Sequence, residues 1–208
     1  MRCRARRVLI WSILCSIVIH AEELPVTETP KYSVVRKQKE IEIRRYAGYI
    51  QAEVDIVEKD HRSAMEKGFR VLAGYIFGEN VSRRRIEMTA SVKTSQSERI
   101  AMTTPVTVTG NERFTVAFIM PSEYKLETLP LPKDGSIHFK AIPPHQMAAV
   151  RFSGYFQTEP IRKNQERLRA WLEEQGLETE GEFVIAGYNP PWVPGFLARN
   201  EVMIRLKG

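Results

Sequence analysis

Apolar and polar residues alternate along the chain after residue 31, and this pattern predicts β-strands. In the segment 32–57, which contains "IEIRRYAGYIQAEVDIV", every second residue is apolar over much of the length. A helix is expected next, because Asp60 is a suitable N-cap and an apolar stripe follows it. This stripe consists of Met65, Phe69, Leu72 and Ile76.

Three further strands are predicted in "RRRIEMTASVKT", "ERIAMTTPVTV" and "RFTVAFIMP", at residues 83–94, 98–108 and 113–121. After a proline-rich loop at 122–136 the same order begins again. "SIHFKAI" and "HQMAAVRFSGYF" predict strands, a second helix is expected from Thr158 to Gly176, and "GEFVIAGYNPPW" and "NEVMIRL" predict the last strands. The fold class is therefore α+β, with an antiparallel sheet, two helices and two structural repeats at about 32–121 and 122–208.

The strand predicted at 98–108 has two unlike faces. We expect its more apolar face to point into the interior of a curled sheet; this face consists of Ile100, Met102, Thr104, Val106 and Val108. The opposite face consists of Ala101, Thr103, Pro105, Thr107 and Thr109. Since proline has no N–H to donate, Pro105 is expected at a sheet edge or a bulge.

The first 21 residues differ from the rest of the chain. Four arginines within residues 2–7 precede an apolar run at 8–19, and Ala21 is a suitable last residue before cleavage. A spanning helix needs roughly 20 apolar residues, more than this run provides. We therefore predict a signal peptide at 1–21 and a flexible segment at 22–31, with an uncleaved anchor as the alternative.

Signal cleavage would change the composition of the chain. It would remove both cysteines, Cys3 and Cys15, and lower the net charge by four, from +6 to +2. The mature chain would have no disulfide and no thiolate metal site. We expect it to be exported, periplasmic or secreted, with no stable membrane anchor and no nucleic-acid partner.

Residue types that support catalysis or metal binding show no suitable spacing. The four histidines, at positions 20, 61, 138 and 145, share no ligand spacing, and Ser153 lacks a nucleophile elbow. Arginines 83–85 form either a solvated loop or a seat for carboxylates or phosphates. Methionines spread over several elements, together with the loop "NPPWVPGFLARN", favour an adaptable apolar pocket, although burial over an ordinary core is the alternative.

Several stretches resemble the SOUL (haem-binding protein) family, in the family's order from Tyr32 to Leu206. They are "YSVVRKQKEIEIRRY", "GFRVLAGYIFGEN", "RIEMTASV", "ERIAMTTPVTV", "FTVAFIMPSEY", "SGYF" and "AGYNPPWVPGFLARNEVMIRL". The resemblance implies a distorted antiparallel β-barrel with two helices, built from two pseudo-symmetric halves. It also implies non-covalent binding of haem or a related tetrapyrrole in a surface groove beside the first helix.

The resemblance also implies which residues form the site. On the helix at 60–77 these are Phe69, Leu72, Ala73 and Ile76, and in the C-terminal loop they are Trp192 and Val193. Arg45 stands where some family members carry a histidine proposed as an iron ligand, so no fixed axial ligand is expected. Gly74 and Val193 stand where basic residues are expected, and Arg45, Lys67 or Arg70 are the candidates to bind propionates instead.

Two functions remain open at this point. The first is an exported, non-catalytic binder of haem or a related tetrapyrrole that acts as carrier, buffer or scavenger. The second is a binding module for another apolar small molecule, or a protein-interaction domain, on the same scaffold, because a fold does not determine a function. An enzyme that uses a bound tetrapyrrole has no support from particular residues.

Overall fold

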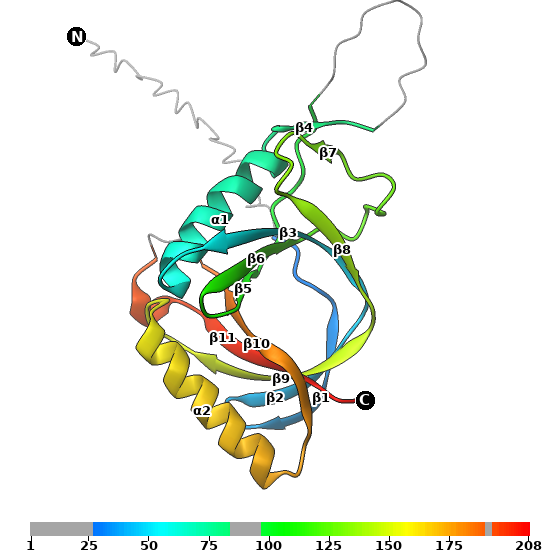
Figure 1. The fold of residues 1–208 in the computed structure, drawn as a ribbon. Coiled ribbons are helices and arrows are strands. Elements are labelled where there is room, and N and C mark those ends of the chain that lie inside the picture. Colours follow the sequence, from blue (N-terminus) through cyan, green and yellow to red (C-terminus); the bar gives the residue numbers. More distant parts are fainter. Residues whose placement is uncertain (1–26, 84–96, 190–192) are drawn as a thin grey trace, which may run out of the picture.

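The computed structural model describes residues 27–83, 97–189 and 193–208 (Figure 1). The predicted signal peptide, residues 22–26 of the segment 22–31 and Trp192 lie outside the described residues, as does nearly all of the strand predicted at 83–94. No helix in the described ranges is long and apolar enough to cross a membrane.

One large antiparallel sheet of nine strands forms the body of the described structure. In chain order its strands are β1 (Tyr32–Gln38), β2 (Ile41–Tyr46), β3 (Tyr49–Val57), β5 (Val106–Thr109), β6 (Arg113–Ile119), β8 (His138–Ile142), β9 (His145–Phe152), β10 (Thr179–Gly187) and β11 (Asn200–Leu206). The short strands β4 (Asn80–Val81) and β7 (Leu131–Pro132) pair separately. The helices are α1 (His61–Ile76) and α2 (Thr158–Glu174), with one 3₁₀ turn at Gly195–Leu197.

The order of the strands in the sheet is β1-β2-β9-β11-β10-β5-β6-β3-β8. From β2 to β8 this order reads the same from the opposite end when β2 is exchanged with β8, β3 with β9, β5 with β10 and β6 with β11. Helix α1 follows β3 in the chain as α2 follows β9. The topology is therefore the one that two similar units would produce if each contributed its first strand to the other unit's side of the sheet.

The sheet curls strongly around its own inner face, with α1 and α2 on the outside of the curl (Figure 1). Its edge strands β1 and β8 are not paired with each other in the described structure, so the curl is open. One apolar cluster lies between α1 and the outer face, and a second lies between α2 and the outer face. A smaller third cluster lines the inner face and includes Tyr46, Met147 and Met203. Both faces of the sheet are therefore covered.

Helix α1 forms where the apolar stripe predicted it. The Asp60 side chain accepts a hydrogen bond from the Ser63 backbone N–H at 2.9 Å, which caps the first turn. The helix ends at Ile76, and Gly78 with a φ of +123° lets the chain turn away. The second helix also occupies its predicted segment and ends before Gly176. The α+β class is confirmed.

The prediction for residues 98–108 was wrong in two respects. Only β5 is a strand of the large sheet, and the residues before it run as irregular chain beside Glu28. Val106 and Val108 lie in the cluster beneath α1, whereas Thr107 and Thr109 line the inside of the curl. The apolar face is turned outward because α1 covers that side of the sheet and excludes water from it.

Candidate functional site

A groove of about 500 Å³ opens between α1 and two segments that are distant in the sequence. One of these segments, residues 154–156, follows β9, and the other, residues 193–200, leads into β11. Figure 1 shows one end of α1 beside the red segment that precedes β11. The lining comprises Arg62, Met65, Glu66, Phe69, Arg70, Ala73, Gly154, Tyr155, Phe156, Gly187, Val193, Gly195, Ala198 and Asn200.

The helix side of the groove is apolar. Met65, Phe69 and Ala73 are spaced by four residues and therefore form one stripe along α1. The Phe69 ring meets Phe118 of β6 edge-on, with centroids 5.4 Å apart, so that the sheet supports it from behind. The Met65 methyl would lie only 2.9 Å from a β-carbon at Gly187, which shows how closely this side chain approaches the end of β10.

Charged side chains of α1 form the rim of the same groove. Arg62 and Glu66 are paired at 2.9 Å, and both are exposed. Within the described part of the chain, Arg70 has no ion-pair or hydrogen-bond partner. The rim therefore presents one uncompensated guanidinium, a group suited to binding carboxylates.

The wall opposite α1 is built from two segments that hold each other. The Gly154 backbone N–H donates to the Gly195 carbonyl at 2.9 Å, and Asn200 Nδ2 donates to the Gly154 carbonyl at 2.8 Å. The Tyr155 ring lies against Gly195, where a β-carbon would be 3.0 Å from three ring atoms. The tyrosine itself is 61% exposed and offers an aromatic surface at the mouth of the groove.

Four of the predicted site residues line the groove together: Phe69, Arg70, Ala73 and Val193. The structure places Leu72 and Ile76 elsewhere, since they are almost completely buried in the cluster between α1 and the sheet. They lie on the side of the helix that faces the sheet. The apolar stripe predicted from the sequence covers a wide arc of the helix, so part of it faces the sheet and part of it faces the groove.

The predicted basic residues are dispersed. Lys67 is ion-paired with Glu58 at 3.1 Å and does not line the groove. Arg45 is exposed on β2 and borders a different depression near Pro144. Arg70 alone of the three lies at the groove.

Sequence reasoning missed several lining residues, although some of them carried a signal. Arg62, Glu66 and Arg70 follow one another at intervals of four along α1, which marks a continuous charged edge beside the apolar stripe. Tyr155 and Phe156 belong to "SGYF", which was recognised only as part of a resemblance. Nothing in the local sequence shows that this stretch contacts Gly195.

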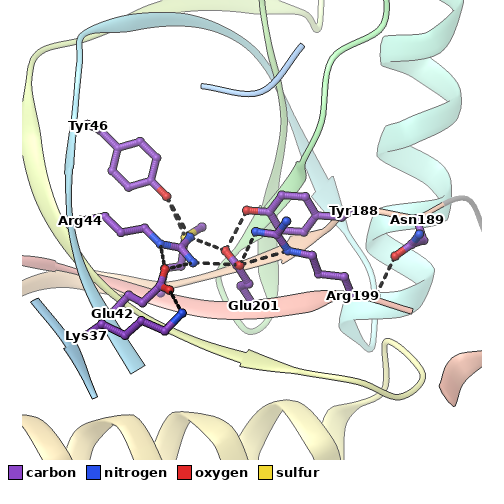
Figure 2. A network of polar contacts seen from close by, with 9 residues as sticks. Lys37, Glu42, Arg44, Tyr46, Tyr188, Asn189, Arg199 and Glu201 are labelled. Atoms are coloured by element: carbon purple, nitrogen blue, oxygen red, sulfur yellow. Dashed lines mark hydrogen bonds and ion pairs between the residues drawn. The ribbon is translucent and has the colours of Figure 1, made fainter. Parts of the chain in front are cut away.

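A second feature, the buried ion pair between Arg44 and Glu201, was not predicted (Figure 2). Arg44 on β2 donates to both carboxylate oxygens of Glu201 on β11, at 2.6 and 3.0 Å. The Arg44 side chain is 3% exposed and that of Glu201 is completely buried. Arg199 and Tyr188 also donate to Glu201, each at 2.7 Å.

This pair shifts the pKa values of its members. Burial alone would raise the pKa of Glu201, but hydrogen bonds from Arg44, Arg199 and Tyr188 hold it below its usual range. Burial would lower the pKa of Arg44, and the Glu201 carboxylate raises it instead. The pKa of Tyr188 is raised by burial and by the adjacent carboxylate. All three groups therefore keep their usual charge states at neutral pH.

The inside of the curl also holds a space of about 340 Å³. Its charged lining is largely paired, with Arg205 on Glu180 at 3.1 Å and Glu53 bonded to His138 at 3.1 Å. In residues 27–83, 97–189 and 193–208, no group of three or more His, Cys, Asp or Glu side chains could hold a metal ion. The groove beside α1 is more apolar and has the unpaired cation, so it is the better candidate for an apolar ligand with acidic groups.

Comparison with known proteins identifies the family of this chain. A family model described as "SOUL heme-binding protein" matches residues 27–205. The chain belongs to the SOUL family. This membership suggests that the protein binds haem or another tetrapyrrole. No curated protein matches the chain closely enough to count as a relative.

Solved structures share the SOUL-type fold at low identity. The C-terminal domain of EcmrR aligns with a TM-score of 0.57 and 12% identity, over 85% of this chain and 98% of that domain. A structure described as a hydrolase from Listeria innocua aligns with a TM-score of 0.52 and 8% identity, over 83% of this chain and 94% of that one. At such identities the likeness shows the fold alone.

The groove fits a tetrapyrrole in size and chemistry. Its volume lies within the roughly 300–1,000 Å³ of small-molecule pockets, and its two sides carry apolar and aromatic groups suited to a flat ring. Arg70 offers a guanidinium at the rim, a group suited to binding carboxylates. Met65 and Tyr155 carry side-chain groups of the kinds that bind haem iron in proteins, and the described lining contains no histidine or cysteine.

Proposed function

We propose that this SOUL-family protein is an exported, non-catalytic binder of haem or a related tetrapyrrole, acting as carrier, buffer or scavenger. The observation that carries the proposal is the groove beside α1, in which Arg70 borders the apolar stripe and has no ion-pair partner among the described residues. The ring would lie between Phe69 and Tyr155, and Arg70 would bind a propionate. Burial of the apolar faces supplies the free energy, at roughly 25 cal/mol per Å² removed from water.

The carrier part of the proposal rests on the groove and on the first residues. Among the described residues, the groove lining offers side chains that bind and orient a ligand and no nucleophile paired with a base. Export rests on the basic and apolar pattern of residues 1–21. N-terminal sequencing of the exported protein tests signal cleavage, and the sequence read should begin at residue 22.

We also propose that residues 32–121 and 122–208 are two repeats of one unit.

Hemin titration tests the binding site. Wild-type protein should shift the Soret band of hemin and saturate at micromolar hemin. Phe69→Asp places a charge on the apolar side of the groove and should abolish saturable binding, because an unpaired carboxylate cannot be desolvated cheaply. Phe77→Asp is the matched control, since Phe77 follows the same helix, is 58% exposed and does not line the groove.

Arg70→Gln provides a graded second variant. Arg70 is exposed, and exposed ion pairs contribute about 0–1 kcal/mol, so the dissociation constant should rise by up to about fivefold. Circular dichroism of each variant verifies that the fold is retained. Equal hemin affinity of wild type and Phe69→Asp would overturn the proposed site.

Another apolar small molecule is the alternative ligand for the same groove. Arg45, at the position of the histidine that some relatives carry, favours this alternative. Native mass spectrometry of protein purified from its source distinguishes the two, because the mass of a copurified ligand identifies it. A tetrapyrrole mass supports the proposal, and a different bound molecule contradicts it.

A further inference from the structure

Residues 193–199 form the C-terminal wall of the groove, to which they contribute Val193, Gly195 and Ala198. This wall leads directly into β11, and on the other side of residues 190–192 the chain comes from β10 through Tyr188 and Asn189. The position of the wall therefore depends on the contact between Gly154 and Gly195 and on what holds Tyr188 and Arg199, the residues next to the two strands.

Both of these residues are bound to Glu201. The Tyr188 hydroxyl donates to Glu201 Oε2 at 2.7 Å, and Arg199 Nη2 donates to Glu201 Oε1 at 2.7 Å. They also hold each other, since the Tyr188 backbone N–H donates to the Arg199 carbonyl at 3.2 Å. The Arg199 guanidinium lies 4.0 Å from the centroid of the Tyr188 ring. The backbone N–H of Arg199 donates to Asn189 Oδ1 at 2.6 Å.

Glu201 is itself held by Arg44 from β2, which is separated from β11 by β9 alone. Arg44 binds it through both carboxylate oxygens, and Arg44 is held by Glu42 at 2.9 Å (Figure 2). Hydrogen bonds between charged groups are strong when water is excluded, and two parallel bonds fix direction as well as distance. A continuous series of hydrogen bonds and ion pairs therefore connects β2 to the residues that flank the C-terminal wall.

We propose that Glu201 is a positioning residue that sets the place of the C-terminal wall and, through it, the affinity and release rate of the groove's ligand. The inference rests on the proposed function for the identity of the ligand. Arg44, Tyr188, Arg199 and Glu201 do not line the groove, so they act through the wall. A wall whose ends are loose must become ordered when the ligand binds. The conformational entropy lost in this ordering makes the binding free energy less favourable.

Tyr188→Phe is the most informative variant. It removes only the hydroxyl that binds Glu201, and that hydroxyl lies inside the curl, where it cannot contact a ligand in the groove. Tyr49→Phe is the matched control, because Tyr49 also lines the inside of the curl and makes no hydrogen bond to Glu201. Glu201→Gln is the stronger variant, since it removes the charge that holds both Arg44 and Arg199.

Two measurements are needed. In ligand-free protein, amide hydrogen exchange at residues 193–199 should be faster than in wild type in both Tyr188→Phe and Glu201→Gln. Exchange in α2 should be unchanged in Tyr188→Phe, and in Glu201→Gln it should increase less than at residues 193–199. Hemin release to excess apomyoglobin should be roughly threefold faster in Tyr188→Phe and roughly tenfold faster in Glu201→Gln. Tyr49→Phe should match wild type in both experiments.

The outcomes separate this inference from the function on which it rests. Unchanged exchange at residues 193–199 in both variants would overturn the positioning role, whatever the protein binds. Faster exchange with wild-type hemin release would show that the wall position does not control the ligand, and would equally overturn the proposal. Failure of wild type to bind hemin would reject the proposed function, and the exchange data would still decide whether Glu201 positions the wall.

Discussion

Replacement of Glu201 by Gln should destabilise the whole protein, because it leaves a buried arginine without its main counter-charge. Removing one partner of a buried ion pair costs about 3–5 kcal/mol. Two features of the structure place this variant near the lower limit. Arg44 keeps Glu42 at 2.9 Å, and Arg199 is one-third exposed and can turn toward water. We therefore expect a loss of about 3 kcal/mol in the free energy of unfolding.

Urea unfolding followed by circular dichroism measures this loss. In thermal unfolding of a chain of this length, each kcal/mol lost lowers Tm by about 2–4 °C, so the expected decrease in Tm is roughly 6–12 °C. Glu178→Gln is the matched control, because Glu178 is ion-paired with Lys207 at 2.9 Å but both side chains are exposed. The control should lose less than about 1 kcal/mol.

The double variant Arg44→Met/Glu201→Gln tests the reasoning more strictly. Removing the guanidinium together with the carboxylate leaves no buried charge, so part of the lost stability should return. A loss below about 1 kcal/mol for Glu201→Gln alone would refute the argument, since it would mean that Arg44 is as well solvated as an exposed residue. The argument would also be refuted if the stability loss of the double variant equalled the sum of the losses of the two single variants.

Three further predictions concern acid stability, helix packing and helix capping. The lowered pKa of Glu201 contributes stability that is present above about pH 4.3, the ordinary carboxyl value, and is lost as pH falls through the folded value; acid titration of stability should therefore be flatter in Glu201→Gln, and identical curves would contradict this. Gly68→Ala would put a β-carbon 2.5 Å from Val116, so despite its better helix propensity it should destabilise the fold by roughly 1–3 kcal/mol in urea unfolding; a more stable variant would show that α1 can move freely. Asp60→Ala removes the side chain that caps the Ser63 N–H and should lower the free energy of unfolding by about 1 kcal/mol in the same assay. Asp60→Ser should retain most of this stability, because serine is also a good N-cap.

Local patterns in the sequence determined the elements that carry the site. The apolar stripe with Asp60 before it predicted α1, and Phe69, Ala73 and Arg70 were assigned to one helix that proved to border a groove. These assignments depend on backbone geometry over a few residues, which the spacing of side chains along the chain reveals directly.

The inner and outer faces of the sheet were decided only by the tertiary structure. A period of two shows that Val106 and Val108 share one face and Thr107 and Thr109 the other, but not which face is inside the curl. Here the helices cover the outer face and the curl encloses the inner one, so neither face is simply exposed to water. Polarity along the strand therefore could not distinguish the inside of the curl from the helix-covered side.

Contacts across long stretches of sequence were also decided only by folding. Arg44 and Glu201 stand 157 residues apart, and each looks like an ordinary charged residue in an alternating strand. The two sides of the groove wall, Gly154 and Gly195, likewise meet through a sheet whose neighbouring strands come from distant parts of the chain. Spacing reports only which residues share an element and a face. Partners on different elements are chosen by strand order and register, because these set the distance and the exclusion of water on which each contact depends.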